Sequence, residues 1–171
     1  MRKLLYLIVC FSFILGCKSD DTVAGDNKKE EKNSSEKSAK VSKQLYEFSP
    51  NAEQDIAEWS SFKLLTEKMD LLIKESNTTD IESLDELSKS IASVEKTIPQ
   101  RIQNLSLNAR LTVLKTQLGM YRDVVSNPLE QPKELHVKFI HNIIDAYNHC
   151  VFQVNDIVEK LETEERYKDL Q

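Results

Sequence analysis

His141, Asp145 and His149 form the one pattern in the sequence that is similar to a metal site. Residues four apart share a helix face, where two neighbouring side chains could hold one ion. The helical repeat, however, places all three opposite the apolar stripe, away from further ligands. We therefore expect a solvated polar face and no metal. The sequence also lacks a glycine-rich phosphate loop, a nucleophile elbow and closely spaced cysteines, so we predict no cofactor and no enzyme.

Arg110 and Phe152 lie on unexpected sides of their predicted helices. Arg110 falls among apolar residues, and a core-facing arginine needs a partner because breaking a buried pair costs about 3–5 kcal/mol. In an antiparallel bundle its neighbours would be Asp55 and Glu95, so we predict a buried polar contact among these three residues; an anion site is the alternative. Phe152 is an aromatic on a polar side. Single exposed apolar residues are common, but this one is a candidate partner contact.

Cys17 is the residue with the most specific predicted chemistry. A basic start and an apolar run over 4–15 are typical of a signal peptide, and the run is too short to span a bilayer. The run ends in Ile14, Leu15, Gly16 and Cys17, which resembles the lipobox of bacterial lipoproteins. The resemblance implies a signal peptide over 1–16, cut after Gly16, and membrane anchoring by lipid on Cys17. A secretory signal with an incidental cysteine is the alternative.

The next residues, Lys18, Ser19, Asp20 and Asp21, resemble the export signal of surface lipoproteins in Bacteroidota. The resemblance implies an outer-membrane protein of the cell envelope that is exposed at the surface. The alternative is simply the acidic start of a tether. Residues 17–44 as a whole combine the lipidated cysteine with a segment rich in Lys, Glu, Ser and Asp, which we predict to be a disordered tether.

The predicted mature chain is acidic, which restricts its partners. Cleavage leaves 21 basic and 28 acidic side chains, and residues 45–171 hold 14 and 22 of them. An acidic domain without a basic stripe argues against nucleic acid and against adhesion to anionic lipid. We expect membrane contact through the lipid alone. Cys150, the other cysteine left after cleavage, is expected to be a buried structural thiol.

Residues 45–171 predict a domain made of helices. Leu45, Tyr46 and Phe48 are expected to form a short arm before the first helix. That helix is predicted from the cap at Ser49-Pro50 to about Glu75. The second helix is predicted from a capping box, with Thr79 as N-cap and Glu82 at N3, to Pro99. The stretch from Pro99 to about Leu105 is ambiguous.

Two further helices complete the predicted domain, one ending at Asn127-Pro128 and one from about Pro132 to Lys168. The apolar stripe of the last helix is wide enough for two neighbours. Short connections favour antiparallel neighbours, so we predict an all-α, antiparallel up-down four-helix bundle behind the signal peptide and tether. A three-helix bundle or an elongated array of helical hairpins is the alternative.

Two stretches carry a family resemblance: 109–116, which begins Ala-Arg-Leu, and 146–155, which begins Ala-Tyr-Asn. With the lipobox, they resemble small helical lipoproteins of Bacteroidota, some of which are called "viral A-type inclusion protein". The resemblance implies a lipoprotein with helices and carries over no catalytic residue. We therefore expect a non-catalytic envelope or surface interaction module with a protein partner. A sensor or carrier that binds a small ligand or metal is the alternative.

Overall fold

The computed structural model describes residues 40–76 and 79–168, and every regular element in these ranges is helical. In chain order they are α2 (Pro50–Ile56), α3 (Ser60–Lys74), α4 (Ile81–Lys96), the 3₁₀ helix η1 (Gln100–Ile102), α5 (Leu105–Val125) and α6 (Lys133–Lys168). The predicted all-α class is confirmed. Across these two ranges, no helix combines the length and the apolar character that crossing a bilayer requires.

Several predicted features lie outside the described residues. They are the signal peptide, the tether over 18–39, the cleavage motif, the lipidation site and the candidate export signal (Ile14, Leu15, Gly16, Cys17, Lys18, Ser19, Asp20 and Asp21).

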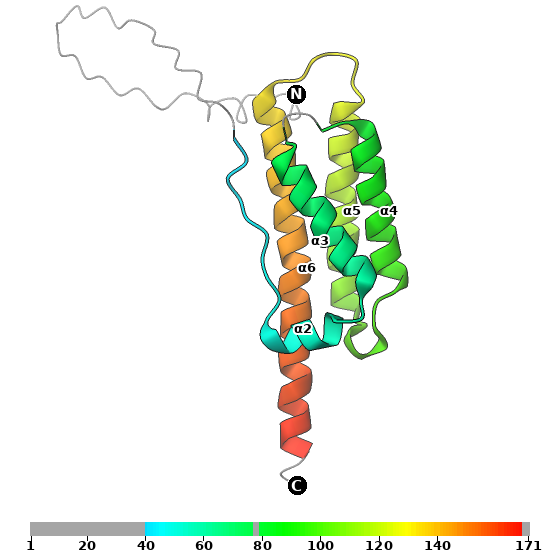
Figure 1. Ribbon diagram of the computed structural model, residues 1–171, viewed down its shortest axis with the longest axis vertical. Coiled ribbons are helices and arrows are strands. Elements are labelled where there is room, and N and C mark those ends of the chain that lie inside the picture. The colour runs from blue at the N-terminus through cyan, green and yellow to red at the C-terminus, as the bar shows by residue number, and fades with distance from the viewer. Residues whose placement is uncertain (1–39, 77–78, 169–171) are drawn as a thin grey trace, which may run out of the picture. The chain divides into compact units, whose positions relative to one another are not determined.

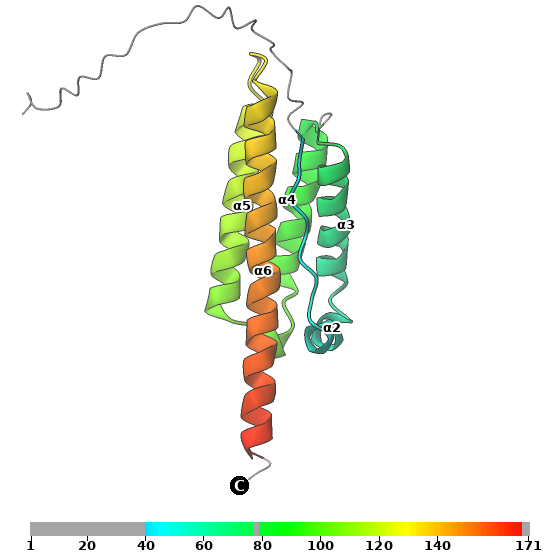
Figure 2. The same ribbon diagram turned by 90° about the vertical axis from the view of Figure 1, so that its left-hand side faces the viewer.

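The four longer helices lie side by side, and successive helices run in opposite directions (Figures 1 and 2). Helix α4 contacts α3 and α5, α5 contacts α6, and α6 also contacts α3. Helix α2 lies across one end of this group and packs against α6. Helix α6 is 36 residues long, and its C-terminal part extends beyond its neighbours. This extension is the most exposed part of the helix.

The core forms because each long helix buries an apolar residue at every third or fourth position. On α4 these are Leu84, Leu87, Ile91 and Val94, and all four are essentially inaccessible. Near α2 the core is aromatic: the Phe62 ring lies 4.9 Å from Trp59 and 5.8 Å from Tyr147, measured between centroids. The predicted apolar stripes are therefore the ones that pack.

The predicted continuous helix from Pro50 to Glu75 is wrong, because the chain turns at 57–59 between α2 and α3. The side chain of Ser49 caps α2 as predicted, accepting from Ala52 N at 3.2 Å. A straight continuation of α3 could not also bury Ala52 and Ile56 at the end of the helical group. The turn instead buries Trp59, whose Nε1 donates to Thr97 Oγ1 at 3.1 Å.

The start of α4 and the ambiguous stretch after it also differ from expectation. Asp80, and not Thr79, is the N-cap: its Oδ1 accepts from Ser83 N at 2.8 Å. This hydrogen bond lowers the pKa of the Asp80 carboxyl. Thr79 instead donates to the Glu75 carbonyl at 3.3 Å, so the predicted capping box with Glu82 does not form. After α4, η1 fills the ambiguous stretch.

Candidate functional site on helix α6

Residues 40–49 run extended along α6 and are called the arm below (Figure 2). Ser42 N donates to His141 Nε2 at 3.3 Å, and Lys43 forms an ion pair with Asp145. The predicted boundary between a disordered tether and the domain, after residue 44, is therefore placed too late. The physical reason is that Val41 packs against the core and the polar residues that follow it have partners on α6.

Two asparagines of α6 hold the main chain of the arm, and we call them the amide clamps. Asn148 Oδ1 accepts from Tyr46 N at 2.7 Å, and its Nδ2 donates to the Gln44 carbonyl at 3.0 Å. Asn155 repeats this arrangement three residues further along the arm: its Oδ1 accepts from Ser49 N at 2.9 Å, and its Nδ2 donates to the Glu47 carbonyl at 3.4 Å. Each clamp therefore binds one carbonyl and the N–H two residues later.

The spacing of the clamps matches the two backbones. Seven residues of helix rise about 10.5 Å, and three residues of extended chain span about 10 Å. Asn148 and Asn155 are seven apart, and the pairs that they bind are three apart. His141, seven residues before Asn148, continues the same line on α6 toward its N-terminus. An extended segment can therefore stay in register with α6 over several turns.

The arm is only partly buried on α6. Val41, Leu45 and Phe48 are half-buried against the core, and the Phe48 ring lies 5.1 Å from that of Phe62. The other side chains of residues 40–47 are exposed. Most of the arm's side chains thus contribute little to its attachment, whereas its main chain contributes several hydrogen bonds.

Phe152 lies on the same side of α6 as the clamps. It follows Asn148 by four residues and precedes Asn155 by three, which places the three side chains on one helix face. Its side chain is 61% exposed, in agreement with the predicted position on a polar side. The residues that contact the arm, together with Phe152, form what we call the arm-binding face: His141, Asp145, Asn148, Phe152 and Asn155.

The candidate metal ligands are divided between two environments. His141 and Asp145 contact the arm and are partly exposed, so the predicted solvated face is partly covered at these two residues. His149 is exposed. Residues 40–76 and 79–168 contain no group of three His, Cys, Asp or Glu side chains placed to hold a metal ion.

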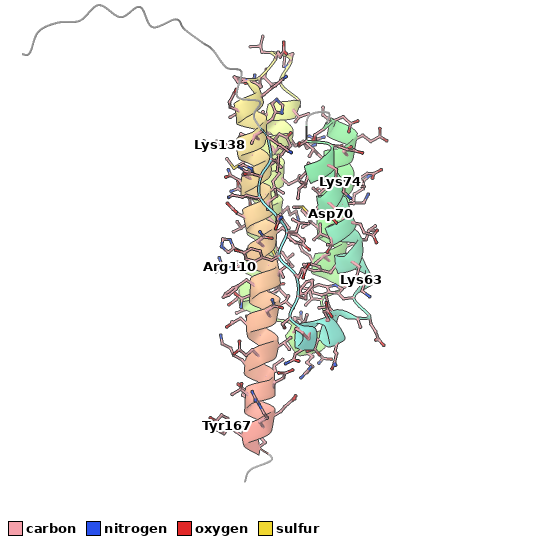
Figure 3. The ribbon with its side chains drawn as sticks, turned by 60° about the vertical axis from the view of Figure 1, so that its left-hand side comes forward. Lys63, Asp70, Lys74, Arg110, Lys138 and Tyr167 are labelled. Atoms are coloured by element: carbon pink, nitrogen blue, oxygen red, sulfur yellow. The ribbon has the colours of Figure 1, made fainter. Side chains whose placement is uncertain are left out.

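The predicted buried contact of Arg110 is wrong. Arg110 is exposed on α5 (Figure 3), because the buried stripe of that helix is narrow and ends beside it. Asp55 instead pairs with Arg101 of η1, and Glu95 pairs with Lys115 at 3.3 Å. Arg101 lies in the ambiguous stretch after Pro99. That stretch has no apolar periodicity, so the sequence does not indicate which way the Arg101 side chain points.

Sequence reasoning also missed the clamps themselves. Asn148 is buried and Asn155 half-buried. On a helical wheel they look like ordinary polar residues at the edge of the stripe. Their seven-residue spacing on a helix that follows a predicted short arm is the signal that could have found them.

A separate cavity of about 340 Å³ lies where α5, the following loop and the start of α6 meet. Its lining includes the polar groups of Tyr121 and His136, whose Oη and Nδ1 are 3.3 Å apart. Burial raises the pKa of the Tyr121 phenol. Apolar side chains of Val124, Val125 and Val137 also line the cavity. Its size and mixed lining suit a small organic molecule.

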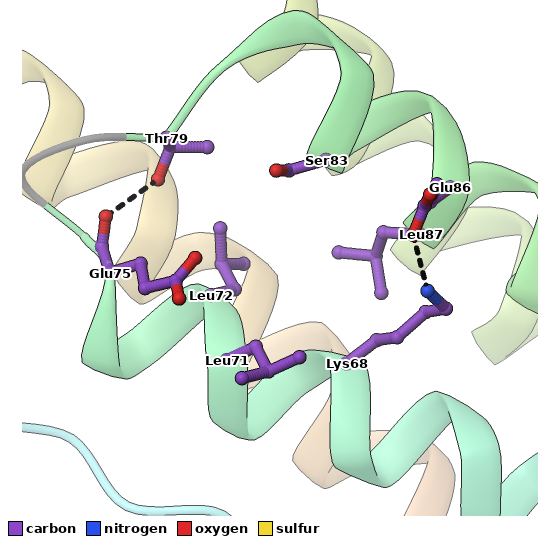
Figure 4. A pocket seen from close by; sticks show the side chains of 8 residues that line it. All are labelled: Lys68, Leu71, Leu72, Glu75, Thr79, Ser83, Glu86 and Leu87. Atoms are coloured by element: carbon purple, nitrogen blue, oxygen red, sulfur yellow. Dashed lines mark hydrogen bonds and ion pairs between the residues drawn. The ribbon is translucent and has the colours of Figure 1, made fainter.

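A smaller hollow of about 70 Å³ lies between α3 and α4 (Figure 4). Lys68 Nζ on one side of the hollow forms an ion pair with Glu86 Oε2 on the other, at 2.6 Å. This ion pair lowers the pKa of the Glu86 carboxyl. Its volume suits a few water molecules, so we assign it no function.

No protein-family model matches the chain, and no curated protein or solved structure is significantly similar to it.

Proposed function

We propose that the chain is a lipid-anchored, non-catalytic interaction module of the bacterial envelope. The signal-like start and the Ile14–Cys17 motif support an anchor on Cys17. Together with residues 109–116 and 146–155, the motif also supports a resemblance to small helical lipoproteins of Bacteroidota. The residues Lys18 to Asp21 support an outer-membrane protein that faces outward. In this proposal the lipid binds the membrane and the helices bind a protein.

The proposal includes the predicted four-helix bundle, and the contacts between the helices support this arrangement. Contacts run from α3 to α4, to α5, to α6 and back to α3, and the connections between these helices are short. This pattern favours an antiparallel up-down four-helix bundle with α2 across one end. Such a bundle presents long, rigid helix faces, which suit protein recognition better than chemistry.

The observation that carries the interaction role is Phe152 between the two amide clamps. A phenylalanine that is 61% exposed loses the benefit of burial, whereas aromatic anchors contribute strongly at interfaces. Here the ring lies on a helix face that already holds an extended main chain. We infer that the partner contacts α6 at this face.

Crosslinking in intact cells tests the partner surface. A photo-crosslinking amino acid replaces Phe152 in the full-length chain, and Met120 of α5, which is 47% exposed, is the matched control position. We expect a reproducible crosslinked protein from position 152 and only background from position 120. The same background from both positions would contradict an interaction through α6.

A small-ligand carrier or sensor remains the second candidate, and the 340 Å³ cavity beside Tyr121 and His136 is the observation that favours it. The sequence left two locations open for such a ligand, the bundle interior and the His141–His149 face, and the arm contacts His141 and Asp145 of that face. Native mass spectrometry of the chain from its own envelope should then detect a bound molecule that a Tyr121→Phe variant loses. Detection of the apo mass alone in both proteins would remove this candidate.

A further inference from the structure

We propose that the arm-binding face is a peptide site that recognises the main chain of an extended segment from a partner protein. The arm is its built-in competitor, and the partner's segment replaces the arm, residues 40–49. This inference rests on the proposed function, because it specifies how the partner of that module binds.

The polar contacts of the face are directed mainly at main-chain atoms. Ser42 N, Tyr46 N and Ser49 N donate to α6, and the carbonyls of Gln44 and Glu47 accept from it. A side-chain amide offers one acceptor and one donor group, which complement the carbonyl and N–H of any extended segment. The clamps therefore require an extended conformation and tolerate many sequences.

Three apolar side chains and one cation add selectivity. Val41, Leu45 and Phe48 face the core, and Lys43 pairs with Asp145. A replacing segment therefore needs a cation two positions after its first apolar residue, followed by a second apolar residue two positions later. The ion pair is half-exposed, so it guides register more than it adds affinity.

The arm can be displaced because it leaves part of the face unused. Its apolar side chains are half-buried, and its other side chains over 40–47 are exposed. Phe152, between the clamps, stays 61% exposed with the arm in place. A partner segment that reproduces the main-chain contacts and also covers this ring gains a contact that the arm does not make. That difference allows a partner to compete with a segment of the same chain.

Peptide binding to the purified mature chain tests the site. The probe is a fluorescent peptide with the sequence of residues 38–49, followed by anisotropy. Leu45→Asp in the chain weakens the arm and leaves the face intact. Apparent affinity scales with the fraction of open site, so this variant should bind the peptide about tenfold more tightly than the wild-type chain, or better. Lys43→Glu is a second arm variant and should act in the same direction.

Matched variants distinguish recognition by the amide clamps from nonspecific binding of the peptide. Adding Asn148→Ala to the Leu45→Asp chain should abolish the gain, whereas adding His149→Ala, at the exposed neighbouring residue, should preserve it. A peptide in which Ser42, Gln44 and Tyr46 are alanine should bind equally well. Circular dichroism confirms that each variant is folded.

Three outcomes would overturn the proposal: no peptide binding by either arm variant, binding that survives Asn148→Ala, or a wild-type dimer that Leu45→Asp dissociates. The last result would show that the occupant is the arm of a second copy. Because the assay uses no membrane, it is independent of the crosslinking test. Peptide binding without a crosslinked protein would refute the envelope partner, and a crosslinked protein without peptide binding would refute only the peptide site.

Discussion

At the scale of single residues, the junction between α2 and η1 depends on the ion pair of Asp55 with Arg101. The Asp55 side chain is only 12% exposed, and Arg101 also lies 3.3 Å from the Glu165 carboxylate of α6. The hydrogen bond with Asp55 raises the pKa of the Arg101 guanidinium. One cation therefore joins three elements that are far apart in sequence.

Replacing this cation should destabilise the fold. Arg101→Met leaves the largely buried Asp55 carboxylate without its partner, and we expect the free energy of unfolding to fall by about 1–2 kcal/mol. Arg110→Met is the matched control and should leave it unchanged, because Asp55 pairs with Arg101 and not with Arg110. Urea denaturation measures both. Equal effects of the two substitutions would contradict the assignment of Asp55 to Arg101.

The thiol of Cys150 and the phenol of Tyr147 should both stay protonated in the folded chain. Burial raises the pKa of each group to about 12. Unfolding restores lower values, so the unfolded chain loses these protons first as the pH rises. We expect stability to decline above about pH 9, the ordinary range of a thiol.

Thiol modification of a Cys17→Ser mature chain at pH 8 provides a direct check on Cys150. The reagent should react slowly with the folded chain and rapidly in guanidinium chloride. Fast modification of the folded chain would contradict the buried position of this thiol.

At the scale of elements, apolar periodicity predicts the helices well and their contacts poorly. The stripe from Leu84 to Val94 is sufficient to predict α4, because a helix must bury one face. The predicted burial of Arg110 is wrong because a helical wheel gives the angular position of a residue around the helix and does not give the width of the buried stripe. Asn148 and Asn155 escaped prediction because their partners are main-chain atoms about a hundred positions away, which leave no local signal.

Hydrogen exchange should reveal the clamps one at a time. The amides of Tyr46 and Ser49 donate to Asn148 and Asn155, so both should exchange slowly although residues 40–49 belong to no regular element. Asn155→Ala should release Ser49 and leave Tyr46 more protected than Ser49. Fast exchange of both amides in the wild-type chain would show that the arm does not stay on α6.

At the scale of the whole molecule, the arm and α6 make the two ends of the helical group different from each other. The start of the arm contacts α6 through Ser42 and His141, near the end where α6 begins, and the C-terminal part of α6 extends from the opposite end of the helical group (Figure 1). The arm-binding face lies between the two ends.

Protease treatment of intact cells tests the proposed surface exposure. A chain with a C-terminal tag should lose the tag while a periplasmic control protein stays intact, because an exported lipoprotein faces the medium. Retention of the tag until the envelope is broken would place the helices in the periplasm. Cleavage of the purified chain under the same conditions is the required control.

The proposed membrane attachment depends on lipid at Cys17, and the mass of the N-terminal peptide from the membrane fraction shows whether that lipid is present. We predict a peptide that begins at Cys17 and carries two or three acyl chains, and no such species from a Cys17→Ala chain. The Cys150→Ala chain, altered at the other retained cysteine, should give the same lipidated peptide as the wild type. An N-terminus at another residue, or an unmodified Cys17, would contradict a lipid anchor on this cysteine.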